Sequence, residues 1–410
     1  MGARRQLLHK VTLYREKGKK DPVTLTYLEE TLRRSQARFR GRTTLTPQID
    51  LGAYRCAAVV DYIDFLFELT RQTQYWKLNE RIEKLTGRKE FPKALNLGPG
   101  KTASRYKLRV QEPNFRTMRQ VLKDFQDTYG FVDPPTIASI EISIDFYPHE
   151  PGEEARALLH GVLTRHFFPT TRVLQRDRMW PRFMPGSIKA TDYTVGRNES
   201  DDSLDLGDRM APGIDRPVLY GSTYYVGERD DPRASWRIQN KVLDKQNPSA
   251  GTRDDLAEEQ KRIRIEVTLG PEGCEEIGLH RFDDLVSLSV TRLQKRFFQF
   301  MKPTFASEGS GGIAPASAVI KQKVEDLRKE RFLNAGVLGL QIREDASVEL
   351  RRINQPTIRR LAAIRGSRVR PIDRTGTGAY GSMSSYGELT RVVERALTKL
   401  QRKIRREMAR

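Results

Sequence analysis

A short stretch at residues 139–147 alternates strictly between apolar and polar side chains. Its sequence, Ser-Ile-Glu-Ile-Ser-Ile-Asp-Phe-Tyr, places the carboxylates Glu141 and Asp145 on one side and the isoleucines on the other. This period of two predicts a β-strand with one buried face. Carboxylates on the second face are costly unless a cation lies between them, so a divalent metal ion held beside a phosphate is one interpretation. A solvated strand face is the other.

A second stretch, residues 263–269, repeats this arrangement. Its sequence is Ile-Arg-Ile-Glu-Val-Thr-Leu, so the apolar side chains share one face while Arg264 and Glu266 share the other. If the two strands lie near each other in one sheet, Glu266 can join Glu141 and Asp145. Three carboxylates at such a distance favour a hard cation, Mg²⁺ or Mn²⁺, which can polarise a phosphodiester. The alternative is a surface ion pair between Arg264 and Glu266.

Tyrosines upstream of this stretch are candidate nucleophiles. Tyr220, Tyr224 and Tyr225 lie on or beside a predicted strand at residues 222–226. A tyrosine hydroxyl can attack a metal-activated phosphodiester and form a covalent phosphotyrosine. Tyrosines in strands are more commonly core or sheet-face residues, so both roles remain open.

The strand predicted at residues 236–242 carries a third polar face. Arg237, Gln239 and Lys241 alternate there with apolar residues. The two cations on this face could contact a phosphate backbone, although a solvated face is an equally good interpretation. The candidate nucleic-acid contacts are Arg229, Arg237, Lys241 and Arg264.

The overall composition indicates a polyanionic partner. The chain has 410 residues, a net charge of +20 and only two cysteines. The length allows two or three domains, and the excess charge favours nucleic acid. The chain has no apolar run of spanning length and no lipidation signal, so we expect no membrane partner. Two cysteines cannot build a disulfide framework, and without a secretory signal they indicate a reducing cytoplasm.

The predicted elements indicate an α+β protein with a central, largely antiparallel sheet, helices packed on one face of it, and a helical basic C-terminal region. Basic, sparsely apolar sequence precedes the sheet, and we expect an arm there with at most a short helix at residues 27–38. Residues 243–261, between two of the predicted strands, form a polar segment. The predicted strands are 59–69, 106–110, 139–147, 222–226, 236–242 and 263–269. The predicted helices are 74–86, 114–129, 153–167, 281–300, 318–332, 356–364 and 389–406.

Shifts in composition divide the chain into five segments. The last helix has an apolar stripe that could pair with a second copy of the chain, bind a helicase or pack against its own domain. The segments are a basic N-terminal arm (1–55), the α+β domain (56–305), a helical module (316–364), a linker (365–385) and a basic amphipathic helix (386–410).

The order of four short motifs resembles the replication initiation factor family of rolling-circle plasmids and some filamentous phages. The motifs are Ile140-Glu-Ile-Ser-Ile-Asp145, Tyr224-Tyr-Val-Gly-Glu-Arg229, Arg237-Ile-Gln-Asn-Lys241 and Ile263-Arg-Ile-Glu266. The resemblance implies a metal-dependent initiator that nicks one strand of a replication origin. In that family a tyrosine stays on the 5′ phosphate and leaves a 3′ hydroxyl as primer. Glu141, Asp145 and Glu266 match the acidic positions.

One position departs from the pattern. The family's tyrosine lies in the third motif, where this chain has Gln239, which cannot form the phosphate ester. Either a neighbouring tyrosine has this role, or the protein binds the origin without cleaving it. The candidate catalytic residues are Tyr225, Tyr224 and Lys241. The alternatives to a nicking initiator are a non-catalytic origin-binding protein and a module that binds single-stranded RNA or DNA.

Overall fold

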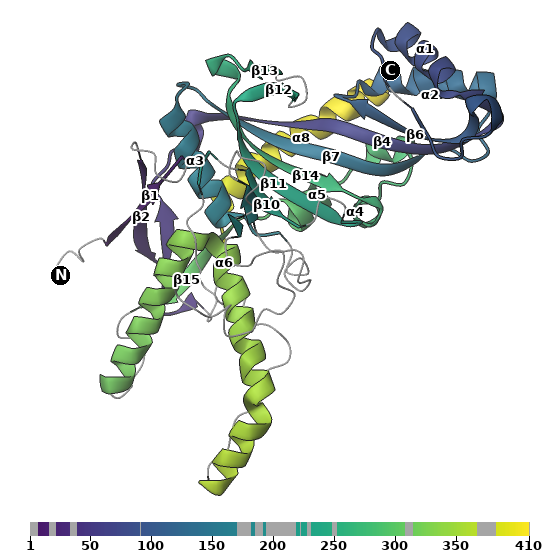
Figure 1. Cartoon of the computed structure of the whole chain (residues 1–410). Helices are drawn as coiled ribbons and strands as arrows, with labels where there is room; N and C mark the ends of the chain where they lie inside the picture. The colour runs from purple at the N-terminus through teal and green to yellow at the C-terminus, as the bar shows by residue number, and fades with distance from the viewer. Residues whose placement is uncertain are drawn as a thin grey trace.

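The computed structural model describes residues 7–15, 22–32, 39–90, 92–169, 182–184, 192–193, 219–221, 223–227, 231–247, 252–307, 315–366 and 383–409. A large sheet of nine strands dominates the fold (Figure 1). In spatial order its strands are β5 (Lys93–Ala94), β6 (Thr102–Gln111), β4 (Tyr54–Gln74), β7 (Thr136–Pro148), β14 (Arg262–Leu269), β11 (Ala234–Lys241), β10 (Thr223–Val226), β8 (Arg182–Met184) and β9 (Asp192–Tyr193). Every neighbouring pair is antiparallel.

A smaller antiparallel sheet of five strands lies at one end of the large one. Its strands come from both ends of the chain, so the N-terminal residues are tied into the fold by partners more than 250 positions away. In spatial order they are β1 (Leu8–Leu13), β2 (Val23–Thr31), β3 (Arg42–Pro47), β15 (Met301–Ala306) and β16 (Met383–Ser385). A separate hairpin joins β12 (Leu243–Asn247) and β13 (Thr252–Asp255).

Helices cover one face of the large sheet. The long C-terminal helix lies across β4 and β7 and also contacts two other helices, so its apolar stripe packs against its own domain. These helices are α1 (Tyr75–Thr86), α2 (Phe115–Tyr129), α3 (Glu153–His166), α4 (Pro271–Glu276), α5 (Val290–Phe297) and α8 (Gly387–Met408). The α+β class with a largely antiparallel sheet and helices on one face is therefore confirmed.

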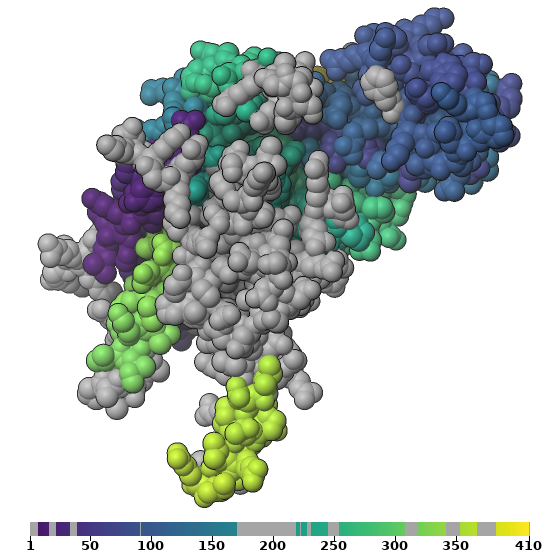
Figure 2. Space-filling view, in the orientation of Figure 1, coloured from purple at the N-terminus to yellow at the C-terminus, as the bar shows by residue number. Residues whose placement is uncertain are grey.

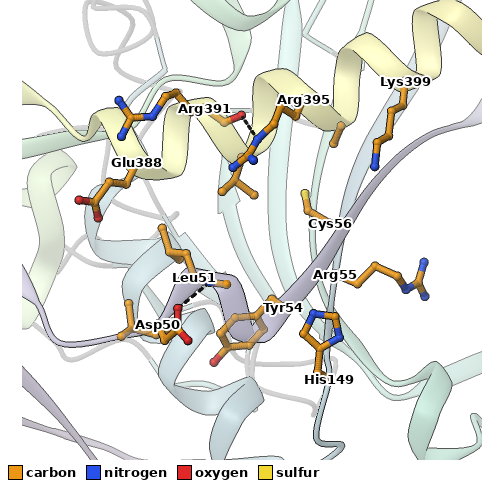
Figure 3. A pocket seen from close by; sticks show the side chains of 14 residues that line it. Asp50, Leu51, Tyr54, Arg55, Cys56, His149, Glu388, Arg391, Arg395 and Lys399 are labelled. Carbon is orange, nitrogen blue, oxygen red and sulfur yellow. Dashed lines mark hydrogen bonds between the residues drawn. The ribbon is translucent and has the colours of Figure 1, made fainter.

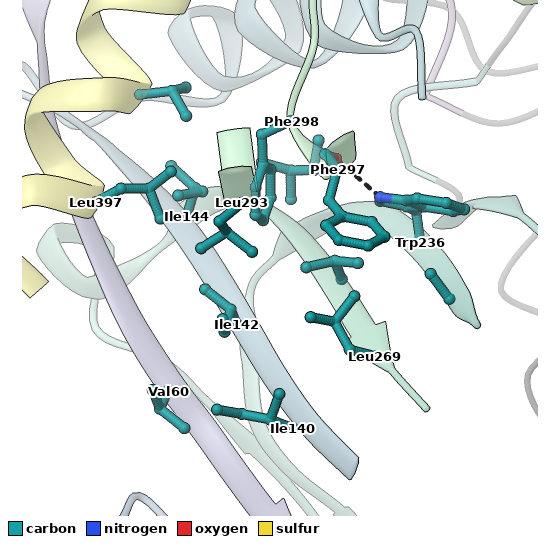
Figure 4. Packing of buried hydrophobic residues seen from close by; sticks show 14 of the residues in the cluster. Val60, Ile140, Ile142, Ile144, Trp236, Leu269, Leu293, Phe297, Phe298 and Leu397 are labelled. Atoms are coloured by element: carbon teal, nitrogen blue, oxygen red, sulfur yellow. Dashed lines mark hydrogen bonds between the residues drawn. The ribbon is translucent and has the colours of Figure 1, made fainter. Parts of the chain in front are cut away.

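The core forms where α8 and α5 meet the apolar face of the sheet (Figure 4). Ile142 and Ile144 of β7 point to this face and are fully buried, as the alternation of the strand requires. Leu397 of α8 packs beside Ile144. The indole Nε1 of Trp236 donates a 2.9 Å hydrogen bond to the carbonyl oxygen of Phe297, which satisfies the one polar atom of a buried ring.

Helix α3 lies between the two sheets, because it contacts β11 and β14 of the large sheet and β1 and β2 of the small one. This position buries polar as well as apolar side chains on the helix. At the closest approach the helix carries Gly161, where a Cβ atom would lie only 2.8 Å from a methyl group of Leu13. A larger residue would require the Leu13 side chain to shift.

Helix α6 (Pro315–Ile364) combines the two C-terminal helices expected from the sequence. Its two halves meet at Gly336, whose φ of +70° favours glycine, and they diverge from there (Figure 1). Lys329 of the first half contacts both carboxylate oxygens of Glu29 on β2 at 2.9 Å. The end of α6 stands away from the other described residues (Figure 2).

Two expectations from the sequence are wrong, and one polar segment contains strands that the sequence did not predict. Residues 27–31 belong to strand β2 rather than to a helix, and the expected basic arm contributes three strands to a sheet. Residues 243–261 contain the β12–β13 hairpin. The helix expected at 281–300 is broken: a 3₁₀ helix (Phe282–Ser287) ends before Ser289, whose hydroxyl caps α5.

Replacing Leu397 with alanine should lower the free energy of unfolding by about 2–5 kcal/mol. The smaller side chain leaves a cavity between α8 and the sheet, and the packed helix and strands cannot move enough to fill it. Urea denaturation followed by circular dichroism measures this change. The matched control is Val319→Ala, since Val319 is 70% exposed and should change stability by less than about 0.5 kcal/mol. Equal stability of the two variants would contradict the packing of α8 on the sheet.

Candidate metal and nucleic-acid site

The face of the large sheet opposite α8 carries a continuous set of charged and polar side chains. The pairing registers bring the predicted residues together: Glu266 lies opposite Ser143 on one side and Arg237 on the other. Arg264 lies opposite Asp145 and Gln239 in the next row. The expected adjacency of the two acidic strands is therefore confirmed.

The guanidinium of Arg264 lies at the centre of this face and is buried. It forms a fork with Asp145, with Nε 2.5 Å from Oδ1 and Nη2 2.6 Å from Oδ2. Its Nη1 donates to Asp61 at 2.5 Å and lies 3.4 Å from Glu266. Burial lowers the pKa of Arg264, but hydrogen bonding and the charge of Asp145 outweigh this effect, so the pKa is raised overall.

Asp145 is engaged by protein groups on both of its oxygens. Besides the fork, Nε of Arg262 lies 3.1 Å from Oδ1, and the hydroxyl of Tyr147 donates to Oδ2 at 3.4 Å. The carboxylate of Asp145 is therefore the counterion of Arg264 and Arg262. We therefore place Asp145 beside the candidate metal site rather than among its ligands.

Asp61 takes the place that the sequence assigned to Asp145. One oxygen each from Asp61, Glu141 and Glu266 lie within 4.8 Å of one another. We call these three residues the acidic triad. Oxygen ligands at this spacing suit Mg²⁺ or Mn²⁺, so the residues present fit the ion that the resemblance implies.

A β-bulge places both Asp61 and Tyr62 on the polar face of β4. The pairing of β4 with β7 shifts register between Val60 and Tyr62, so Asp61 is the extra residue. Its carboxylate accepts a 2.8 Å hydrogen bond from the hydroxyl of Ser143. The available sequence signal was two aspartates, Asp61 and Asp64, inside an otherwise apolar strand.

Protein groups contact the other members of the triad. Arg237 pairs with Glu266 and lies 3.4 Å from Glu141. Thr268 donates to Glu141 at 2.7 Å, and the amide of Gln239 donates to Glu266 at 3.3 Å. Three guanidinium groups, from Arg237, Arg262 and Arg264, thus face four carboxylates, those of the triad and Asp145. The ammonium of Lys241 also interacts with Asp61 and Asp145, so the charges of this group balance, and a divalent cation would bind by displacing guanidinium contacts.

Lys241 lies at the edge of this charged face and is partly buried. Burial lowers its pKa, and repulsion by Arg264 and Arg262 adds to the effect, against the opposing charges of Asp61 and Asp145. Its ammonium therefore releases a proton more readily than that of an exposed lysine.

The two candidate tyrosines point to opposite faces of β10. Tyr224 pairs with Ile238, faces the core and is fully buried, which is the wrong side for attack on a phosphate beside the triad. Tyr225 is partly buried and lies opposite Arg237, in the same cross-strand row as Glu266. Two strand spacings, about 10 Å, separate its backbone from that of Glu266. Arg229 lies outside the described residues.

A second charged group continues the polar face toward β6. Asp64 is fully buried and accepts a fork from Arg109 at 2.7 and 2.8 Å. Lys107 and the hydroxyl of Ser139 lie 3.0 and 2.8 Å from the same carboxylate. Burial alone would raise the pKa of Asp64, but these hydrogen bonds lower it overall.

Comparison with known proteins adds no relative: no family model, no curated protein and no solved structure matches this chain. The resemblance to replication initiation factors therefore rests on the motifs alone. Within the described residues, every helix is too short or too polar to span a bilayer.

Replacing Arg264 with alanine should cost about 3–5 kcal/mol of folding free energy, because it leaves buried carboxylates without their shared counterion. Arg264→Lys keeps the charge but loses the fork, so it should recover only part of this loss. Urea denaturation at pH 7 measures both. An Arg264→Ala variant with the wild-type free energy of unfolding would show that this guanidinium does not stabilise the buried carboxylates.

Asp64 should make folding stability sensitive to acid. Its pKa is lower in the folded protein than in the unfolded chain, so its stabilisation is complete above the unfolded value and is lost as the pH falls through the folded value. Asp64→Asn should destabilise most at pH 6–7 and progressively less below about pH 4. Urea denaturation from pH 7 to pH 2 tests this, with Asp127→Asn at an exposed position as control. A stability difference that is constant over this range would contradict the linkage.

Proposed function

We propose that the protein is a DNA-binding replication initiator of a mobile element, which nicks one origin strand with a tyrosine nucleophile and a divalent cation. The observation that carries this proposal is the convergence of the acidic triad from three strands, β4, β7 and β14, beside Tyr225 and Arg237 on one sheet face. The net charge of +20 supports a polyanionic substrate.

The triad would hold Mg²⁺ or Mn²⁺, which supplies Lewis acidity to a phosphodiester and neutralises developing charge. The protein's own groups bind and orient the strand. Arg237 can donate to a phosphate oxygen through the side of its guanidinium that does not bind Glu266. Lys241 lies further along the same strand and is the candidate group for proton transfer near the reacting phosphate.

Tyr225 is the nucleophile in this proposal. Its Oη forms a bond to phosphorus, the bond from phosphorus to the 3′ oxygen breaks, and the phenolic proton passes to a nearby base while the 3′ oxygen takes up a proton. The products are a 5′ phosphotyrosine and a free 3′ hydroxyl. The reaction conserves the energy of the phosphodiester, so the same site can rejoin the strand.

One observation favours a non-catalytic relative of such initiators. Gln239, at the position of the family's tyrosine, hydrogen-bonds to Glu266 and so lies directly beside the triad. A protein that lost this nucleophile could keep the scaffold and bind the origin without cutting it. The charged face would then serve DNA binding and sheet stability alone.

Incubating the full chain with supercoiled DNA of its own genetic element and Mn²⁺ should give a relaxed product and a protein–DNA adduct on denaturing gels. Tyr225→Phe should abolish both, because phenylalanine has no hydroxyl to form the ester. Tyr224→Phe is the matched control and should nick normally, since Tyr224 faces the core. Glu266→Gln should raise the Mn²⁺ requirement by roughly 10–100-fold.

The outcomes separate the two functions. DNA binding without any adduct, in the wild type and in both tyrosine variants, would establish the non-catalytic alternative. An adduct that persists in Tyr225→Phe would show that another residue is the nucleophile.

A further inference from the structure

A cavity of about 580 Å³ lies on the other side of the large sheet from the acidic triad (Figure 3). It is open to solvent on one side and is bordered by the first half of α8, by the start of β4 and by the 3₁₀ turn η2 (Leu51–Ala53) that precedes this strand. Cys56 of β4 faces it, because Cys56 pairs with Phe146 and so points to the same side as the core. A volume of this size is typical of sites for small ligands.

The cavity is lined by an unusual number of cations. Arg391, Arg395 and Lys399 follow one another at steps of four residues, so they project from one side of α8 at intervals of about 6 Å. Figure 3 shows Arg395 and Lys399 above Cys56, with Arg55 of β4 at the far edge. His149 adds an imidazole on the side opposite α8.

These cations differ from those of the triad face in forming no ion pair with the residues that the structure describes. Within the described residues, neither Arg55 nor any of the three α8 cations forms an ion pair. Arg55 lies 4.0 Å from the centre of the Tyr147 ring, and Arg395 donates only to a backbone oxygen at 3.3 Å. Two acids line the cavity, and Asp50 is already bound to the backbone N–H of Gly52 at 2.8 Å.

Thiol chemistry does not explain this arrangement. Burial raises the pKa of Cys56 to about 12, although the positive charges of Lys399 and Arg395 act in the opposite direction. The thiol therefore stays protonated at neutral pH and is a poor nucleophile. The Cys56 thiol therefore contributes only a small, weakly polar part of the cavity wall below the cations.

We propose that this cavity binds a nucleotide through its phosphate. Guanidinium groups form paired hydrogen bonds to phosphate oxygens, and the three cations of α8 against two carboxylates leave the cavity positive. Arg55 is not counted among them, because it pairs with Tyr147 and therefore points to the other face of β4. Ile49, Leu51 and Val392 supply an apolar wall that suits a sugar or base. The nucleotide is either one unit of a nucleic-acid strand or a free mononucleotide. The site is separate from the triad and does not depend on metal binding there.

The test uses the full chain with the double substitution Arg395→Gln and Lys399→Gln. The matched control is Arg402→Gln with Arg406→Gln, which removes the same charge from exposed positions of the same helix outside the cavity. One arm measures the affinity for a single-stranded oligonucleotide at several salt concentrations. The other measures binding of deoxyadenosine monophosphate by titration calorimetry.

If the ligand is a nucleic-acid strand, the double variant should reduce the slope of log affinity against log salt by about 1.4, and the control should leave it nearly unchanged. If the ligand is a free nucleotide, wild type and control should bind the monophosphate and the double variant should not. A variant that exchanges the two cations, Arg395→Lys with Lys399→Arg, keeps both charges and should bind the oligonucleotide or the monophosphate as the wild type does.

The proposal is overturned if the double variant and the control behave alike in both arms. Equal urea midpoints for the two variants verify that a loss of binding is not a loss of fold. The substituted residues lie on the face opposite the triad. A failure to detect nicking therefore does not bear on nucleotide binding in the cavity, and the two proposals can fail separately.

Discussion

The buried guanidinium of Arg264 is the interaction on which the polar face of the large sheet depends. Removing several carboxylates from water costs several kcal/mol for each ion unless a counterion lies in direct contact. Arg264 contacts Asp61 on β4, Asp145 on β7 and Glu266 on its own strand, β14. One cation therefore offsets the repulsion among acids on three adjacent strands and allows them to converge.

The same strands carry the core on their other side, and this division fixes the register. A shift of one residue in β7 would turn Glu141 and Asp145 toward α8 and expose Ile142 and Ile144. Hydrophobic burial on one face and ion pairing on the other thus specify the same alignment. The packing of the core thus fixes the relative positions of the three carboxylates, because the strands that carry them cannot shift in register.

The sequence revealed what depends on local periodicity. The alternation of residues 139–147 and 263–269 predicted two strands, their faces and the approach of Glu266 to Glu141. Asp61 was missed because a bulge places Asp61 and Tyr62 on the same face and so interrupts the alternation that revealed the other acids. Asp145 was predicted to bind a metal ion because the sequence does not show which cation lies beside its carboxylate. The structure shows that this cation is the guanidinium of Arg264.

Long-range pairing was equally hidden. The N-terminal residues look like a solvated arm because basic segments interrupt their strands, and the partner of β3, strand β15, lies far along the chain. The expected helix at residues 281–300 failed for a local reason: the hydroxyl of Ser289 accepts the N–H of Arg292 and starts a new helix there. Apolar spacing alone did not reveal that interruption.

Arg237 links the two parts of the proposed function. Its guanidinium contacts Glu266 and Glu141, the acids that would hold a cation, and it lies in the row of Tyr225, where a phosphate would be attacked. The carboxylates contact Nε and Nη2 of Arg237, so the rest of the guanidinium would meet a phosphate. A cation at the triad would release these two contacts for the DNA as well, so metal and DNA should each favour binding of the other.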